Sequence, residues 1–374
     1  MTVYLIIISL LIVGVYRFDY KKKKVGKETY FLLMLLLFIS LAGLRFEVGG
    51  DTLRYMRGFR NMVVGLTMDS VQMGEKNQPL AVLIFGGIKI SGGEFWLIQL
   101  IYAVIFNIII FWFINKYSPH RYTCLLLYFI FFYPKLNFEV IRESLAIAFF
   151  MIGFVYLNKG KIWVYWLCTL GAFLSHISGL FMIFFLIIRK IPVTPLFLLL
   201  YIVLSFILSF FSDTILLQFS SIGNVSSWVE YQSTMVGKIT IIIKAIIYPL
   251  IVYYVVKCQN ISPVILKALK LYPLIGCAEL AIFILYRYEN YMIPIMIIGL
   301  GSIVYSIPIT RIYKRLINAL SVVILALLVY IPPYFASISN EKYIPYYEFW
   351  IPYYSIFDQN QDTGRRALLS LWGK

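Results

Sequence analysis

The sequence predicts an all-α, polytopic integral membrane protein. Of its 374 residues, 61% are hydrophobic and only 13% are charged, whereas about a quarter of a soluble domain is charged. Apolar runs of roughly 15–20 residues recur from one end of the chain to the other, and they suggest about 11 to 12 transmembrane helices, one of them a broken pair. Each span should be helical, because lipid offers no partners to an open backbone. We expect one transmembrane domain over residues 1–374.

The charge and the cysteine usage exclude several classes of protein. A net charge of +16 without a Lys/Arg-rich tail argues against nucleic acid as a partner. It fits basic loops on the cytoplasmic side and anionic membrane lipids. The four cysteines form no C-x-x-C pair and there are two histidines, so we expect neither a disulfide framework nor a metal site. The first apolar run lacks the basic start of a signal peptide, which favours a retained helix.

The first apolar run sets the predicted topology. It covers residues 2–16 and is followed at once by a basic loop containing Lys21–Lys24, which we place in the cytoplasm. A second helix over residues 28–44 then returns to the outer face. The outer segment 45–93 contains a twelve-residue apolar run, 79–90, that is too short to span a bilayer. We expect it to form a helix at the membrane surface, begun by Pro79.

The remaining runs continue this alternation. They predict helices at residues 94–115, 122–133, 138–157, 195–211, 239–256, 267–286, 291–307 and 316–334. A Ser-rich outer loop is expected at 212–238. The segment 335–374 is rich in Tyr and Trp and is typical of an aromatic segment at the outer surface.

The run 162–188 admits two interpretations. One continuous helix would move every later basic loop to the outside. Two half-helices broken near Ser175–Gly179 keep those loops inside. Each half would measure about 21 Å at ~1.5 Å per residue, which is shorter than the bilayer core. We prefer the broken pair because it agrees with the basic loops, and it requires a thinned or water-accessible surrounding.

A charged stretch follows the second helix directly. It begins at Gly43 and places Arg45, Glu47, Asp51 and Arg54 at the mouth of that helix. Gly49-Gly50 allows the backbone to turn sharply with positive φ. A charge costs about 2.5–3.5 kcal/mol at a helix centre and less near the interface. Four such groups at one mouth favour a functional site.

Further charged residues share the predicted outer side. Arg142 opens the helix at 138–157, His176 lies in the break, and Arg287 follows the helix at 267–286. Together with Arg45, two of these residues provide the planar guanidinium groups that recognise phosphate oxygens in pairs. Asp51 or His176 could take a proton from an attacking hydroxyl. The sequence thus indicates a cationic, outward-facing site.

Structural explanations compete with these roles. Arg45 could be an interfacial side chain paired with Asp51, and Arg142 could form an ion pair with Glu139 or Glu143.

His176 and Arg287 have similar alternatives. The imidazole of His176 could bond a backbone carbonyl freed by the break. Arg287 could pair with Glu289 or interact with a helix dipole. The types and positions of these charged residues do not by themselves distinguish an enzyme from a transporter.

The charged stretch resembles a family hallmark. Gly43-Leu-Arg45-Phe-Glu-Val-Gly-Gly-Asp51-Thr52-x-x-Tyr55 matches the pattern R-x-x-x-G-x-D-T-x-x-Y of the EpsG/Wzy family of polysaccharide polymerases. Three later elements occur in the family's order: Asn137-Phe-Glu-Val-Ile-Arg142-Glu143 resembles N-x-x-x-x-R-Q, Ser175-His176-Ile-Ser178-Gly179 resembles H-x-S-A, and Pro352-Tyr-Tyr-Ser355-Ile-Phe resembles P-Y-x-S-x-F.

The resemblance implies an enzyme of the bacterial cytoplasmic membrane, with a GT-C-like fold and an active site facing the periplasm or exterior. It joins oligosaccharide repeat units carried on undecaprenyl diphosphate, as in O-antigen, capsule or exopolysaccharide synthesis. The implied partners are the lipid-linked donor and acceptor, with a chain-length regulator as a further option. No nucleotide sugar or other cofactor is needed, and the outer loops contain no D-x-D-type metal motif. We therefore expect metal-independent transfer.

The implied site roles follow from these motifs. Diphosphate binding falls to Arg45, Arg142 and Arg287. The base is Asp51, then His176, with Glu47 as a further candidate. Substrate binding falls to Tyr55, Asn137 and Arg54.

Three other functions compete with polymerisation. A flippase for the lipid-linked oligosaccharide would also need a cationic site, but should have pseudo-symmetric halves, and we find none. An O-antigen ligase would share the chemistry and differ in its acceptor. A sugar O-acetyltransferase should keep its His and Arg groups near the cytoplasmic face.

Overall fold

The computed structural model describes residues 1–62, 78–218, 235–257, 261–304, 324, 326–337, 343–358 and 363–371. Over these residues the secondary structure is helical, apart from two isolated β-bridges. The contacts of the chain group it into two compact units. Unit 1 comprises Met1–Leu180 and Tyr330–Lys374, and unit 2 comprises Phe181–Val329. We describe each unit separately, and the single domain stays a prediction.

The helices bear out the predicted class. Four are long and apolar enough to cross a membrane, namely Thr2–Tyr20, Phe95–Tyr117, Ile141–Asn158 and Gly237–Lys257. Five shorter apolar helices accompany them: Pro79–Ile90, Arg121–Phe131, Ile162–Ser175, Ile177–Ile188 and Pro195–Phe211. The prediction of an all-α, polytopic membrane protein is therefore confirmed.

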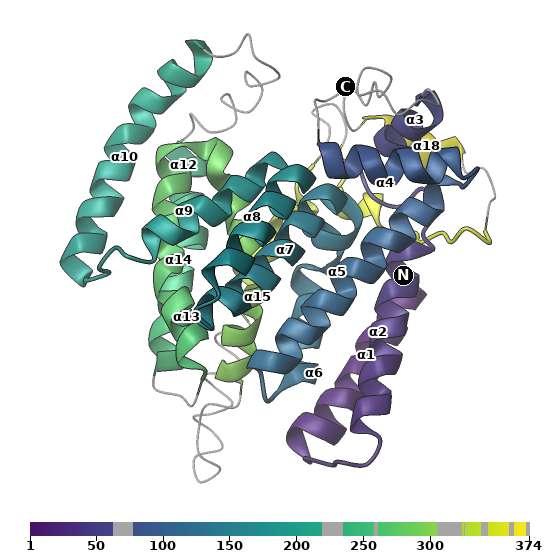
Figure 1. Ribbon diagram of the computed structural model, residues 1–374, viewed down its shortest axis with the longest axis horizontal. Helices are drawn as coiled ribbons and strands as arrows, with labels where there is room; N and C mark the ends of the chain where they lie inside the picture. The colour runs from purple at the N-terminus through teal and green to yellow at the C-terminus, as the bar shows by residue number, and fades with distance from the viewer. Residues whose placement is uncertain are drawn as a thin grey trace. The chain divides into compact units, whose positions relative to one another are not determined.

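Unit 1 is built from apolar helices that pack in series (Figure 1). Their bounds are α1 (Thr2–Gly14), α2 (Lys27–Gly43), α5 (Phe95–Tyr117), α6 (Arg121–Phe131), α7 (Ile141–Asn158) and α8 (Ile162–Ser175), with a π-helical turn η1 (Val15–Tyr20) extending α1. α2 packs on α5, α5 on α7, and α7 on α8, while α1 packs on α6. The turn η1 carries the first helix to Tyr20, beyond its predicted end at residue 16.

Aromatic side chains fix α2 against α5 and α6. The ring of Phe38 is fully buried and meets the rings of Phe111 at 5.1 Å and Tyr133 at 4.8 Å, both edge-on. The Tyr133 hydroxyl also donates to the Phe38 carbonyl at 2.5 Å. Edge-to-face pairs add about 0.5–1.5 kcal/mol each to the burial of the rings. This contact therefore locates the end of α2 from which the charged stretch departs.

Two short helices and the C-terminal segment cover one end of unit 1. These are α3 (Thr52–Asn61), α4 (Pro79–Ile90), α17 (Pro332–Phe335), η9 (Tyr346–Phe349) and α18 (Thr363–Leu371). α4 has the predicted bounds and begins with Pro79. Lys89 of α4 donates to the carbonyls of Phe59 at 3.1 Å and Arg60 at 3.2 Å, so a cation caps the C-terminus of α3. Figure 1 draws α3 and α18 beside each other, and the two helices are in contact.

The break after residue 175 is present as predicted. α8 ends at Ser175, His176 is extended with φ −159° and ψ 140°, and a 3₁₀ turn η4 (Ile177–Leu180) follows. η4 folds back against α8, because a Cβ on Gly179 would lie 2.4 Å from the carbonyl carbon of Ala172. Only glycine permits this approach. The next helix, α9 (Phe181–Ile188), belongs to unit 2.

Unit 2 contains the later spans. They are α9, α10 (Pro195–Gln218), α12 (Met235–Ile241), the π-helical η6 (Ile242–Ile247), α13 (Tyr248–Lys257), α14 (Pro263–Ala281), the 3₁₀ turn η7 (Phe283–Tyr286) and α15 (Arg287–Ile303). α14 approaches η6 closely, because a Cβ on Gly276 would lie 2.4 Å from the Ala245 oxygen. Lys244 and Glu289 form an ion pair of 2.8 Å.

Several predicted boundaries in unit 2 change or cannot be assessed. The predicted helix 267–286 ends at Ala281, since Ile282 is extended. The predicted outer loop 212–238 is helical at both of its ends, in α10 and α12. Residues 219–234, and residues 305–323 of the last predicted helices, lie outside the described residues.

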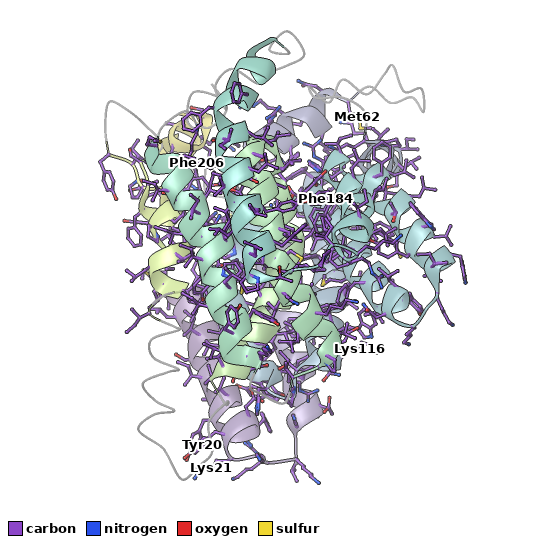
Figure 2. All side chains as sticks on the ribbon, turned by 90° about the vertical axis from the view of Figure 1, so that its left-hand side faces the viewer. Tyr20, Lys21, Met62, Lys116, Phe184 and Phe206 are labelled. Atoms are coloured by element: carbon purple, nitrogen blue, oxygen red, sulfur yellow. The ribbon has the colours of Figure 1, made fainter. Side chains whose placement is uncertain are left out.

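Figure 2 shows the two ends of unit 1. Tyr20 and Lys21, after α1, lie at one end, and Lys116 at the end of α5 lies toward the same end. Met62, after α3, lies at the opposite end. The basic loop and the cap of short helices are therefore separated along the unit, as the predicted topology requires. Which end faces the cytoplasm stays a prediction.

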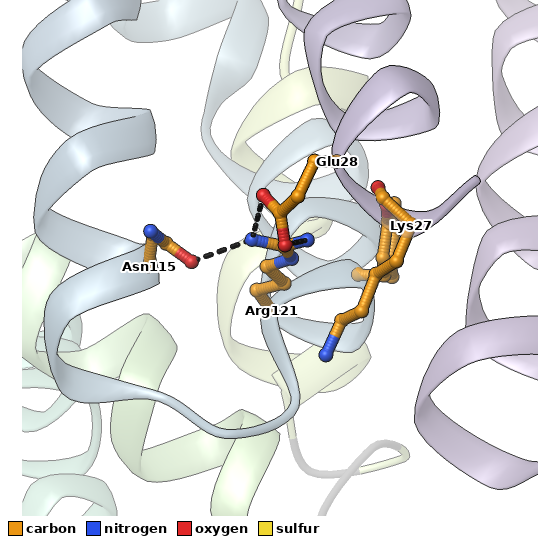
Figure 3. A network of polar contacts seen from close by, with 5 residues as sticks. Lys27, Glu28, Asn115 and Arg121 are labelled. Carbon is orange, nitrogen blue, oxygen red and sulfur yellow. Dashed lines mark hydrogen bonds and ion pairs between the residues drawn. The ribbon is translucent and has the colours of Figure 1, made fainter. Parts of the chain in front are cut away.

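A polar network ties the helices together at the basic end (Figure 3). The Arg121 guanidinium donates through both terminal nitrogens to Glu28, at 2.9 and 2.6 Å, and also to Asn115 at 2.7 Å. Its carbon lies 4.2 Å from the ring centroid of Phe31. The Arg121 side chain is 4% exposed and that of Glu28 is 78% exposed. Arg121 is therefore the buried donor in all three hydrogen bonds, and it joins α6 to α2 and α5.

Arg121→Leu should destabilise the protein by about 2–3 kcal/mol, because a buried arginine loses three charge-assisted bonds and leaves Asn115 without its donor. Glu28→Gln should cost less than about 1 kcal/mol, because that partner is exposed and glutamine still accepts. Thermal unfolding of both variants in detergent measures the difference. Equal losses would show that the exposed carboxylate, and not the buried arginine, holds this end together.

Candidate active site

The charged stretch after α2 forms a tight turn that glycine makes possible. Gly49 has φ +109°, and a Cβ there would lie 2.8 Å from the Phe138 oxygen. Glu47 also has a positive φ of 51°, which is rare for a residue with a side chain. The turn is bridged to the C-terminal segment, since Phe46 N–H donates to the Tyr354 carbonyl at 2.8 Å and Ile356 N–H to that of Leu44 at 2.9 Å. Two predicted motifs are thus adjacent in unit 1.

Arg45 lies inside this turn. Its side chain is 2% exposed; Nε donates to the Val48 carbonyl at 3.1 Å, and Nη1 donates to the carbonyl of Ala42. The guanidinium also lies 5.3 Å from the ring centroid of Phe138. Burial lowers the pKa of Arg45 to about 10, so the group remains charged at neutral pH. The alternative of an interfacial Arg45 paired with Asp51 does not fit this burial, and the observed contacts hold the turn. Diphosphate binding by Arg45 stays a prediction.

Glu139 connects three distant parts of the chain. Both of its carboxylate oxygens accept the Gly50 N–H at 2.9 Å. The Trp350 indole donates to it at 2.6 Å, and Tyr346 is hydrogen-bonded to it. Its side chain is only 5% exposed. Burial, followed by the negative charge of Asp51, raises the pKa of Glu139, while the donors oppose this rise.

Asp51 stands directly before α3. Its own N–H lies 3.4 Å from Glu139, and its carbonyl accepts the Tyr55 N–H at 3.0 Å. Its side chain forms no capping bond to the helix that follows. The carboxylate interacts electrostatically with both Glu139 and Arg142. The predicted base therefore lies between an acidic and a basic side chain.

Arg142 lies in the first turn of α7, as predicted. Its Nε donates to the Tyr55 hydroxyl at 3.3 Å, and its guanidinium carbon lies 5.1 Å from the centroid of that ring. Asp51 and Tyr102 also interact with it electrostatically. The suggested ion pair with Glu139 is not formed, because the Glu139 carboxylate receives the Gly50 N–H and the indole. Arg142, Asp51 and Tyr55 thus come together from two of the predicted motifs.

A π-helical turn, η3 (Lys135–Glu139), separates α6 from α7 and accounts for the position of Asn137. α7 consequently begins at Ile141 and not at residue 138. The Asn137 amide donates to the Tyr128 hydroxyl at 2.7 Å and to the Tyr133 carbonyl at 3.1 Å, and accepts from Asn107 at 2.8 Å. Its side chain is buried and joins helices. Substrate binding by Asn137 stays a prediction.

Glu47 and the C-terminal helix form an ion pair. Arg366 of α18 donates to the Glu47 carboxylate at 2.7 Å, and Arg365 donates to the Glu47 carbonyl at 3.0 Å. Arg365 also donates to the carbonyls of Glu348 and Phe349. These contacts favour a role for Glu47 in fixing the turn, and its assignment as a base stays a prediction.

His176 is engaged by the turn that follows it. The Ser178 N–H donates to His176 Nδ1 at 3.1 Å, and the Ser178 hydroxyl lies 2.7 Å from the same nitrogen. An Nδ1 that accepts places the proton on Nε2 in the neutral ring. In this tautomer His176 offers an N–H donor at Nε2; a proton on Nδ1 would displace the Ser178 N–H, whereas the Ser178 hydroxyl could then accept from it. Its assignment as a base stays a prediction.

The remaining predicted residues are Tyr55 and Arg54 of α3 and Arg287 of unit 2. Tyr55 is buried on the inner face of α3, whereas Arg54 is exposed on the outer face together with Arg57 and Arg60. Arg287 opens α15 in unit 2 and does not end α14; its guanidinium carbon lies 5.3 Å from the ring centroid of Tyr286. The role of Arg287 in the site stays a prediction.

Sequence reasoning missed Glu139, Trp350 and Arg365 as members of this region. Glu139 was weighed only as an ion-pair partner for Arg142, and Trp350 was assigned to a membrane-surface belt. Trp350 is only 5% exposed, so the belt interpretation is wrong for it. The only sequence feature that indicates a special role for Glu139 is its position as an acidic residue within the mainly apolar segment 136–141.

Comparison with known proteins agrees with the motifs. The sequence model of the EpsG family matches residues 28–355. No curated protein and no solved structure matches the chain. The matched range contains the turn after α2, the Glu139–Arg142 element, the break at His176 and the segment ending at Ser355. The chain therefore belongs to the EpsG family, a family of Wzy-like polysaccharide polymerases.

Proposed function

We propose that the protein joins oligosaccharide repeat units carried on undecaprenyl diphosphate, at the outer face of the bacterial cytoplasmic membrane. Membership of a polysaccharide polymerase family supports the reaction class. The observation that carries the proposal is the group Asp51, Arg142 and Tyr55, which combines a carboxylate, a guanidinium and a phenol at one place in unit 1. A GT-C-like fold and a chain-length regulator as a partner are further parts of the proposal.

The chemistry needs one base and one cationic group. The acceptor hydroxyl oxygen attacks the anomeric carbon of the donor, and the bond from that carbon to the diphosphate oxygen breaks. The diphosphate leaves with the electron pair, and Asp51 accepts the hydroxyl proton. A diphosphate leaves without protonation, so a second carboxylic acid, as in glycosidases, is not required. Arg142 would stabilise the negative charge that develops on the leaving group.

The two motif arginines differ in how they would serve this reaction. The guanidinium of Arg142 contacts Tyr55, interacts electrostatically with Asp51 and is only half-buried. That of Arg45 is fully buried on the carbonyls of Val48 and Ala42. We therefore assign the contact with diphosphate to Arg142 first, and assign Arg45 the task of holding the turn that presents Asp51.

The function can be tested in a strain that lacks its matching polymerase. The wild-type chain should restore a ladder of surface polysaccharide on a gel. Asp51→Asn and Arg142→Ala should yield only single capped units at normal membrane levels, because one lacks the base and the other the cation. A ladder from both variants would mean that the site is wrong. Failure of the wild type, with the lipid-linked unit accumulating outside, would refute polymerisation; a unit trapped inside would favour a flippase.

Replacing Arg45 and replacing Arg142 should affect the stability of the protein differently. Arg45→Lys keeps the charge but lacks the forked donors, so unfolding in detergent should become easier by about 2–3 kcal/mol as buried carbonyls lose charged donors. Arg142→Lys is the matched control and should leave the unfolding temperature near that of the wild type while the ladder weakens. A wild-type unfolding temperature for Arg45→Lys would contradict a role in holding the turn.

A further inference from the structure

We propose, on the basis of the polymerase function proposed above, that Glu139 is a positioning residue that fixes the Asp51 carboxylate beside Arg142. Its carboxylate accepts the Gly50 N–H at 2.9 Å and lies 3.4 Å from the Asp51 nitrogen. From the sequence, Glu139 is expected only as an ion-pair partner of Arg142. It acts through Asp51 and has no assigned contact with substrate.

The geometry makes Glu139 the anchor of the turn. The Gly50 nitrogen lies 2.9 Å from each carboxylate oxygen, so the peptide between Gly49 and Gly50 is held at the centre of the carboxylate. The next residue is Asp51, and α3 starts one residue later at Thr52. Gly49 reaches its positive φ against the Phe138 carbonyl, next to Glu139 in the chain. The start of α3, and with it the direction of the Asp51 side chain, therefore depends on Glu139.

The Glu139 carboxylate is also hydrogen-bonded by the C-terminal segment. The Trp350 indole donates to Oε1 at 2.6 Å. Tyr346 is hydrogen-bonded to the same carboxylate, and Gly49 N–H donates to the Phe349 carbonyl at 2.9 Å. These contacts leave Glu139 little freedom to change rotamer, and a residue that positions another must itself be held.

The negative charge of Glu139 is expected to act on Asp51 in a way that a neutral hydrogen-bond acceptor would not. A buried carboxylate is costly, so backbone N–H groups alone do not explain its choice. A second negative charge near Asp51 disfavours ionisation of that residue and thereby strengthens it as a base. Among the described residues, Arg45, Arg142, Tyr334 and Tyr346 also interact electrostatically with one or both of these carboxylates. Glu139 is thus expected to influence both the position and the proton affinity of Asp51.

The test uses the full-length protein in nanodiscs, with the undecaprenyl-diphosphate-linked repeat unit extracted from the strain lacking its polymerase. Glu139→Gln preserves the shape but removes the charge and one acceptor. We expect kcat to fall by about ten- to a hundredfold, because small misplacements of a reacting group have effects of this size, with KM changed less than about twofold. The acidic limb of the pH profile of kcat should move to lower pH, because Asp51 loses a neighbouring negative charge.

Glu143→Gln is the matched control, since it neutralises a buried acid one residue beyond Arg142. Its acidic limb should coincide with that of the wild type. An unshifted limb in a folded Glu139→Gln protein, or a kcat equal to that of the wild type, would overturn the positioning role.

A second variant keeps the proposal testable if glutamine prevents folding. Glu139→Asp retains the charge but withdraws it from the Gly50 N–H, so kcat should fall with KM unchanged; a wild-type kcat would refute the proposal. Failure of the proposed function would look different, because the wild-type protein itself would then form no polymer from the lipid-linked unit.

Discussion

The carboxylate of Glu139 is the group on which the candidate site depends. It is buried and charged in an apolar environment, so it is tolerated only because backbone and side-chain donors surround it. Those donors come from the turn after α2 and from the C-terminal segment, while Glu139 itself belongs to the π-helical turn before α7. Since the three segments share this one acceptor, a shift in any of them changes the position of the others.

Around this centre, the charged residues of the turn divide into two kinds. Arg45 and Glu47 are buried and bound to carbonyls or to Arg366, so their charges shape the backbone. Asp51 and Arg142 lie at the starts of α3 and α7 and interact electrostatically, and Arg142 also donates to the Tyr55 phenol. The family motif therefore combines residues that build the turn with residues that suit the chemistry. A motif alone does not separate them, because burial decides which role a charged side chain has.

Much of the fold could be predicted from local sequence. Apolar runs located the spans, Pro79 marked the start of α4, and the basic loops required the break at Ser175–Gly179 that the structure contains. The predicted common side of the membrane for Asp51 and Arg142 is consistent with their electrostatic interaction. The contact of Glu139 with Trp350 could not be predicted, because it joins residues 211 positions apart and has no periodic signal. The π-helical turn that displaces the start of α7 was equally invisible, since its composition resembles that of a helix.

The contact between Glu139 and Trp350 also has a consequence for biogenesis. A ribosome adds about 5–20 residues per second, so the 211 residues between the two partners take roughly 10–40 s to synthesise. During this time α2, α5 and α7 can enter the bilayer, while the turn that presents Asp51 lacks its last donors. Completion of the site therefore waits until Trp350 has been made. A chain that stops before this residue would occupy the membrane without a finished site.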